Sequence, residues 1–160
     1  MIIEGLRKYM LNCPCLDTFN NAIRVNVNYL DSEVDTFNNA IRVNVNYLDS
    51  EVDTYSIEEV PCEPILKKYL DGSSLRQYLF VFTSREPYSA NEVQNIENSG
   101  FYEKFADWIE IQNDNEVFPT LDENMECTEI KVTSTGYAFA VNEDTAQYQI
   151  QLRLKYLKKK

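Results

Sequence analysis

The chain has 160 residues, of which 44% are hydrophobic and 26% charged, and its formal net charge is −11. These values fit one domain over residues 1–160 and exclude wholesale disorder. Histidine is absent, which excludes Ser-His-Asp and Cys-His catalysis and histidine metal sites. No apolar run reaches the roughly 18 residues of a membrane helix, and the first residues do not form a secretory signal. We therefore expect a soluble protein of a cytoplasm.

The first predicted element is a short amphipathic helix over Ile2–Leu11. Ile3, Leu6 and Met10 share one face at helical spacing, and Pro14 follows the end of the pattern.

An internal duplication comes next, because residues 17–34 and 35–52 are identical at all eighteen positions. Apolar and polar residues alternate over 23–29 and again over 41–47, so each copy predicts one strand. Repeat architectures generally need three or more units, and two identical copies indicate a recent or engineered duplication. Two arrangements stay open: one copy joins the sheet while the other loops out, or both copies pair as strands.

Three further strands are predicted before the middle of the chain. Thr54–Val60 is the first, and Ile65–Leu70 and Leu75–Thr83 flank the turn signal Asp71–Ser74, which predicts a hairpin. Tyr78–Phe82 is apolar on both faces, and we expect a central strand covered on both sides.

A helix is predicted from Ser89, where Ser89-Ala90-Asn91-Glu92 matches the capping box. Its apolar residues recur at helical spacing as far as Ile109, and Asn98-Ser99-Gly100 interrupts the pattern. Two arrangements stay open at this point: a kink or two helices in series, or one straight helix. An acidic loop over Asn113–Glu126 should follow.

Three strands close the chain: Glu129–Ser134, Tyr137–Ala140 and Tyr148–Tyr156. The last is the clearest, because apolar and polar residues alternate along it. This order of elements predicts an α+β fold with a mixed, mostly antiparallel β-sheet. The N-terminal helix and the central amphipathic helix should pack on the sheet.

Few residues suggest chemistry. Cys13, Cys15, Cys62 and Cys127 lack zinc-site spacing, and we expect reduced thiols. Adjacent carboxylates such as Glu58-Glu59 point to opposite faces of a strand, and the four glycines are isolated. We therefore predict no catalytic residues, no metal and no cofactor.

The charge distribution indicates a protein partner. Between Glu86 and Glu129 there are twelve acids and one base, whereas acids and bases cancel elsewhere. Only Lys158–Lys160 cluster positive charge, which disfavours direct nucleic-acid binding. The eleven tyrosines are compatible with a partner or oligomer surface.

The chain resembles the tail-terminator, or tail-completion, proteins of long-tailed bacteriophages and the related minor structural proteins of prophages. The resemblance rests on Leu75–Phe82, Gly100–Trp108 and the closing unit of Ser134–Phe139, Asn142–Asp144 and Tyr148–Tyr156. It implies a subunit that can be monomeric in solution and assembles into a ring, commonly of six. That ring would stop growth of the tail tube and join the head connector, in the virion or in the cytoplasm of the bacterial host.

Under this interpretation the acidic stretch should face a basic partner ring. The expected partner-interaction residues are Asp114, Glu116, Asp122, Glu123 and Glu126. Two alternatives stay open: a small acidic inhibitor or DNA mimic, and a metal-dependent enzyme of the carboxylate type.

Overall fold

A seven-stranded sheet forms the centre of the protein. The computed structural model describes residues 1–14, 16, 43–45, 54–87, 92–141 and 145–160. The strand order is β1-β2-β4-β7-β5, with β3 added beside β4 and β6 beside β7. All pairs are antiparallel except β1–β2, which is parallel. The sheet is therefore mixed and mostly antiparallel, as predicted.

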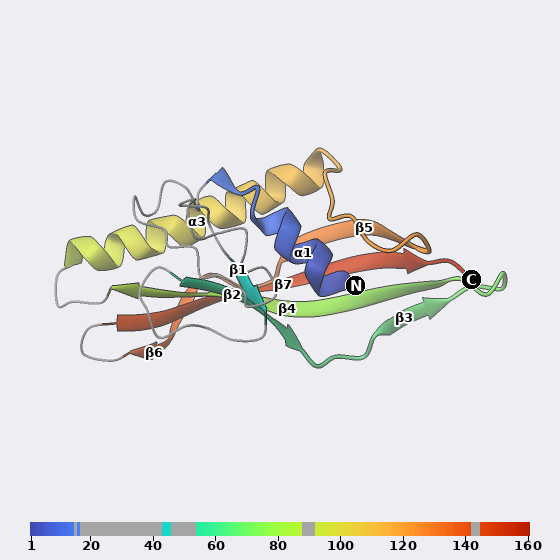
Figure 1. The fold of residues 1–160 in the computed structure, drawn as a ribbon, viewed down its shortest axis with the longest axis horizontal. Coiled ribbons are helices and arrows are strands. Elements are labelled where there is room, and N and C mark those ends of the chain that lie inside the picture. The colour runs from blue at the N-terminus through green and yellow to red at the C-terminus, as the bar shows by residue number, and fades with distance from the viewer. Residues whose placement is uncertain (15, 17–42, 46–53, 88–91, 142–144) are drawn as a thin grey trace, which may run out of the picture.

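Two long strands, paired with each other, form the middle of this sheet (Figure 1). β4 (Ser74–Pro87) and β7 (Thr145–Lys158) have 14 residues each and pair along their whole length. β2 (Thr54–Val60) and β3 (Ile65–Lys68) share the outer edge of β4. β5 (Met125–Val132) and β6 (Tyr137–Val141) share the outer edge of β7. β3 and β6 consequently lie at diagonally opposite corners.

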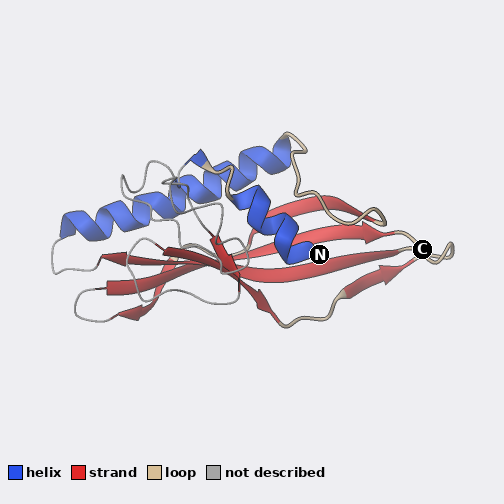
Figure 2. Cartoon of the chain, in the orientation of Figure 1, coloured by secondary structure: helices blue, strands red, loops and turns tan. Residues whose placement is uncertain are grey.

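The helices α1 (Ile2–Met10) and α3 (Glu92–Asp114) cover one face of the sheet (Figure 2). Every second residue of β7 from Ala146 to Tyr156 is buried against them, which is the alternation expected of a half-covered strand. No helix among the described residues is both long and apolar enough to cross a membrane.

Aromatic packing joins the helices to the sheet. Phe105 of α3 is fully buried and stacks on Phe82 of β4, with ring centroids 4.7 Å apart and an interplanar angle of 11°. Tyr9 of α1 contacts Trp108 of α3 at a centroid distance of 5.2 Å. The two helices and the central strand thus share one core.

The α+β prediction is confirmed, and so are most predicted elements. At Asn98-Ser99-Gly100, where the sequence leaves two arrangements open, the structure has one continuous helix from Glu92 to Asp114 and not two in series. The buried ring of Phe101, just after Gly100, is one of the contacts that hold this part of the helix on the sheet, and such packing overrides a weak local propensity. The predicted start at Ser89 lies outside the described residues.

The range of the acidic loop and the covering of the central strand differ from the prediction. The acidic loop is shorter than the predicted range Asn113–Glu126, since Asn113 lies within α3 and Glu126 belongs to β5. Tyr78–Phe82 is central in the sheet, but α1 and α3 cover only one of its faces. On the opposite face Val81 is nevertheless buried, whereas Leu79 is half-buried.

The second copy of the duplicated segment contributes β1 (Val43–Val45), which pairs with Tyr55–Ile57 of β2. Residues 17–34, the first copy, lie outside the described residues, including the strand predicted at 23–29. The second copy is therefore the one that supplies a strand to the sheet within the described part of the chain.

Deleting residues 17–34 is expected to leave the fold intact. The connection between α1 and β1, residues 11–42, shortens from 32 residues to 14, which can still span up to about 45 Å, and α1 and β1 are neighbours. We expect a midpoint of thermal unfolding within about 5 °C of the parent, since the length of a connection between two elements changes stability only slowly. Circular dichroism melting of both chains measures this. Because the two copies are identical, deleting either gives the same chain, so a loss of the cooperative transition would mean that one copy does not suffice for the fold.

Candidate functional site

A half-open groove of about 510 Å³ runs between α1 and the segment 117–122 (the α1 groove). Glu4, Gly5 and Lys8 line it from α1, and Val117 to Asp122 line it from the other side. Gly5 lets the two walls meet, because a Cβ atom there would clash with the carbonyl oxygen of Thr120. The groove therefore depends on a close backbone approach between residues more than a hundred positions apart.

Hydrogen bonds and an ion pair fix the segment 117–122 to its surroundings. The Tyr9 hydroxyl donates to the Val117 carbonyl oxygen at 3.0 Å, and the Val117 amide donates to the Gln112 carbonyl oxygen at 2.9 Å. The amino group of Met1 lies 2.7 Å from Oδ1 of Asp122. Burial raises the pKa of Tyr9 well above its ordinary value, so this hydroxyl stays a donor at neutral and moderately alkaline pH.

All five predicted partner residues lie around this segment, and all five are exposed. Asp114 is the last residue of α3, and Glu116 follows in the turn with a φ of 56°. Asp122 and Glu123 stand at the other end of the segment, and Glu126 belongs to β5. Of these acids Asp122 lines the α1 groove, and Glu116 and Glu123 are next to lining residues in the chain.

Two of the five acids have partners in their own chain. Asp122 pairs with the amino group of Met1, and Oε2 of Glu126 lies 3.2 Å from Nζ of Lys159. Asp114, Glu116 and Glu123 form no ion pair with any described residue. These three carboxylates are available to a partner.

The turn between β3 and β4 projects beyond the helices at one end of the sheet (Figure 1). Tyr69 and Ser73 close it by a backbone hydrogen bond of 2.9 Å, and Gly72 has a φ of 90°, which glycine adopts without strain. The Asp71 carboxylate accepts hydrogen bonds from the amide and hydroxyl of Ser73, which lower the pKa of Asp71. The turn therefore has a defined conformation.

The same turn carries exposed apolar and basic side chains. Leu66 is 44% exposed, Tyr69 38%, and Leu70 fully exposed. Lys67 and Lys68 are also exposed, and the Nζ of Lys67 lies 5.3 Å from the ring centroid of Tyr69. We call residues 66–73 the hairpin tip. The sequence predicts a turn here but does not reveal that these apolar side chains are exposed.

A third exposed apolar surface lies on β6, at the opposite corner of the sheet. Phe139 is 62% exposed and Val141 50% exposed, and these two residues define the β6 corner. Isolated exposed apolar residues are common, but two large ones on a short edge strand are typical of a contact surface.

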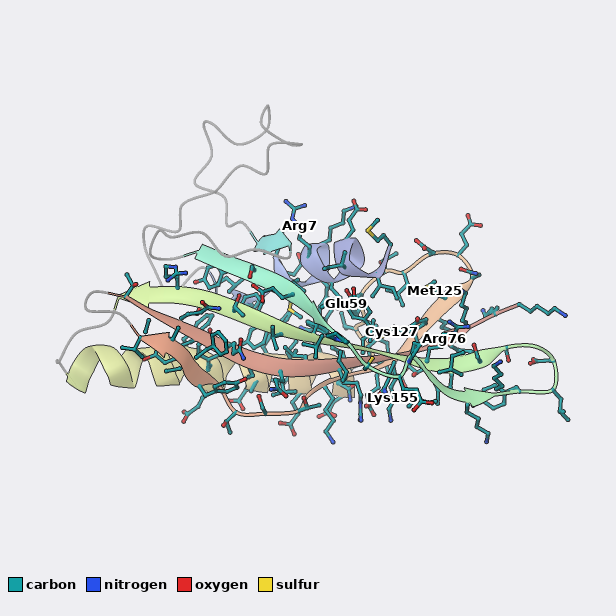
Figure 3. The ribbon with its side chains drawn as sticks, turned by 90° about the horizontal axis from the view of Figure 1, so that it is seen from below. Arg7, Glu59, Arg76, Met125, Cys127 and Lys155 are labelled. Carbon is teal, nitrogen blue, oxygen red and sulfur yellow. The ribbon has the colours of Figure 1, made fainter. Side chains whose placement is uncertain are left out.

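A cluster of tyrosines and cysteines lies on the helix-covered face of the sheet. The strand registers place Arg76, Tyr156 and Cys127 side by side across β4, β7 and β5, and Figure 3 labels Arg76 and Cys127 together with Glu59 of β2. Burial raises the pKa of Tyr78, with a smaller contribution from the Glu59 carboxylate. Burial likewise raises the pKa of Tyr156, although Arg76 opposes this shift.

The raised pKa values keep the phenols of Tyr78 and Tyr156 and the thiol of Cys127 in their protonated forms at neutral pH. A general base or nucleophile needs a pKa near or below the working pH, and the shifts found here run the other way. Among the described residues, no three acids or cysteines are grouped so as to hold a metal ion. The arrangement favours packing of the tyrosines over acid–base work. Cys13 departs from the expected reduced thiols, because it is disulfide-bonded, whereas Cys62 and Cys127 are free.

Cys127 is expected to react slowly with iodoacetamide. Burial raises the pKa of its thiol to about 12, so at pH 8 the reactive thiolate should be roughly 10³-fold scarcer than for an ordinary cysteine. Mass spectrometry of the alkylated peptides, with and without urea, measures the difference. Equal rates in both conditions would contradict the burial.

The same thiol links stability to pH. Its pKa is higher in the folded than in the unfolded chain, so its contribution is complete below about pH 8.5. That contribution is lost as the pH rises towards 12.

The α1 groove has no counterpart among the features predicted from the sequence. Its walls come from the two halves of the chain, and the one local signal was Gly5, a helix-weakening residue inside an amphipathic helix. No protein-family model matches this sequence, and no curated protein matches it significantly.

Proposed function

We propose that the chain is a non-catalytic structural subunit of a long-tailed phage or prophage, similar to a tail terminator. It assembles as a ring on the tail tube, where it stops polymerisation and offers a platform to the head connector. The observation that supports this proposal is the presence of three separate surface features that a partner could contact: the hairpin tip, the α1 groove and the β6 corner.

A subunit of a capping ring needs different surfaces for its two neighbours and another for the tube. A head-to-tail interface, which joins two unlike surfaces, closes into a ring when the rotation between copies allows it. The registers place Lys68 of the hairpin tip opposite Ser74, and Val141 opposite Ala146, which pairs with Glu86. The hairpin tip and the β6 corner are thus about 40 Å apart along β4, so one small partner cannot cover both.

The chemistry of the site is consistent with a non-catalytic role. The buried phenols and the Cys127 thiol have raised pKa values, and the acidic residues are exposed carboxylates at the surface. Like charge on neighbouring acidic segments would also disfavour stacking of rings in the wrong orientation.

The test is the length distribution of phage tails, measured by electron microscopy with the gene intact and deleted. We expect overlong tails of variable length, without heads, in the deletion. Tails of normal and uniform length would reject the terminator role.

In that event the second candidate, an acidic inhibitor or DNA mimic, becomes the better interpretation, because Asp114, Glu116 and Glu123 are exposed without an ion pair to any described residue. Its test is tight, salt-sensitive binding to a nuclease or restriction enzyme.

A further inference from the structure

We propose that the hairpin tip of one copy docks into the α1 groove of the next copy, with Leu70 as its apolar anchor. This inference deepens the proposed function and rests on it, because it names the two unlike surfaces that join neighbours in the ring.

The hairpin tip has the properties of a preformed ligand. Its turn is closed by backbone hydrogen bonds and by the Asp71 side chain, so little conformational entropy is lost on docking. Leu70 stands at its end and is fully exposed. A fully exposed leucine at the tip of a rigid, projecting turn contributes the most binding free energy when it is buried in an apolar recess.

The α1 groove has the matching size and lining. Its volume of about 510 Å³ lies within the range of about 300–1,000 Å³ in which proteins bury small ligands or side chains. Val117, half exposed, and Leu121 offer apolar contact on one wall. The hydrogen bonds of Tyr9 and Gln112 to Val117 hold this wall in place before docking.

The charges of the two surfaces are complementary. The segment 113–126 contains five acids and no base, whereas the hairpin tip contains two lysines and one acid, Asp71, whose carboxylate is hydrogen-bonded to Ser73. Glu116 and Glu123 flank the groove next to Val117 and Asp122, and both lack an ion-pair partner within the described part of the chain. Lys67 and Lys68 of a docked tip would be able to reach this acidic rim, although Lys8 on α1 already pairs with Glu4 at 3.4 Å.

The groove cannot be filled by the hairpin tip of its own chain. β3 is hydrogen-bonded to β4. β4 in turn pairs with β7 along its whole length, beginning at its first residue, Ser74, which lies opposite Lys158. Figure 3 shows α1 and the β3–β4 turn well apart on the molecule. A second copy is therefore the source of the tip.

The experiment measures self-association of the full chain by sedimentation velocity over a range of concentrations. Leu70→Asp disables the tip and Val117→Asp disables the groove. Both side chains are exposed, so neither change should unfold the protein. We expect association that weakens with added salt and is about 30-fold or more weaker in either variant, as for a central interface residue. Phe139→Asp, at the β6 corner, is the control and should associate like the parent.

Mixing the two disabled variants gives the sharpest result. Leu70→Asp keeps an intact groove and Val117→Asp keeps an intact tip, so the mixture has one functional interface and should form a one-to-one heterodimer but no larger species. A parent chain that stays monomeric at millimolar concentration, or variants that associate as the parent does, would overturn the docking.

The same variants separate this inference from the proposed function. If gene deletion gives overlong tails but Leu70→Asp and Val117→Asp both restore normal length, the terminator role holds and the docking is wrong. If deletion leaves the tails normal, the terminator role fails, whereas heterodimer formation would still support the contact.

Discussion

Replacement of Phe105 by alanine is expected to cost about 3–5 kcal/mol of the free energy of unfolding, as for other buried phenylalanines. The Phe105 side chain is fully buried between α3 and the sheet and stacks on Phe82. Alanine would leave a cavity that the neighbouring rings of Phe101 and Trp108 cannot fill without leaving their own contacts. The loss is a large share of the roughly 5–15 kcal/mol that stabilises an ordinary domain.

Urea denaturation followed by tryptophan fluorescence measures this loss, because Trp108, the one tryptophan of the chain, lies 6.4 Å from Phe105 between ring centroids. Ile111→Ala, on the same helix but at a side chain that is 55% exposed, is the matched control and should change stability by less than about 1 kcal/mol. Equal effects of both changes would mean that α3 does not pack on the sheet through Phe105.

The second large effect is expected at Gly136, where alanine should destabilise the fold by about 1–3 kcal/mol. A Cβ atom at this position would lie 2.5 Å from both Cβ and Cγ of Tyr102. Those atoms cannot move aside easily, because Tyr102 is buried and its hydroxyl shares a hydrogen bond with Ser84 of β4.

Gly100→Ala provides a control of opposite sign. Gly100 lies inside α3 with nothing within 4 Å of its added Cβ, so alanine should stabilise the chain by up to about 1 kcal/mol through helix propensity alone. Thermal melts of the two variants should therefore shift in opposite directions. A destabilising Gly100→Ala would contradict the continuous helix through this position.

Local patterns were sufficient for most of the sheet. The alternation of Tyr148 to Tyr156 predicted β7, and the turn signal at Asp71–Ser74 predicted the β3–β4 hairpin. Both depend on interactions between residues that are near in sequence or on a period of two, which a single chain displays directly. The interruption at Asn98-Ser99-Gly100 left the continuity of α3 open, because local propensity is weaker than the burial of an aromatic face, which depends on tertiary contacts.

The candidate surfaces were predictable only in part. The excess of acids between Glu86 and Glu129 pointed to five carboxylates that are exposed in the structure, of which Asp122 lines the α1 groove. Nothing local indicated that Asp122 would pair with the amino group of Met1 or Glu126 with Lys159. Nor did the sequence reveal that Leu70 would be fully exposed, because it ends a stretch that predicts a strand.

By itself the sequence determined the fold class, the long strands, the acidic segment and the absence of histidine chemistry, since these follow from residue types and short-range periodicity. Tertiary structure alone decided which copy of the duplicated segment supplies β1, how Gly5 brings α1 against Thr120, and where the hairpin tip and groove lie. Each of these depends on contacts between residues far apart in the chain. Such contacts form only when the whole core closes, and no local pattern records them.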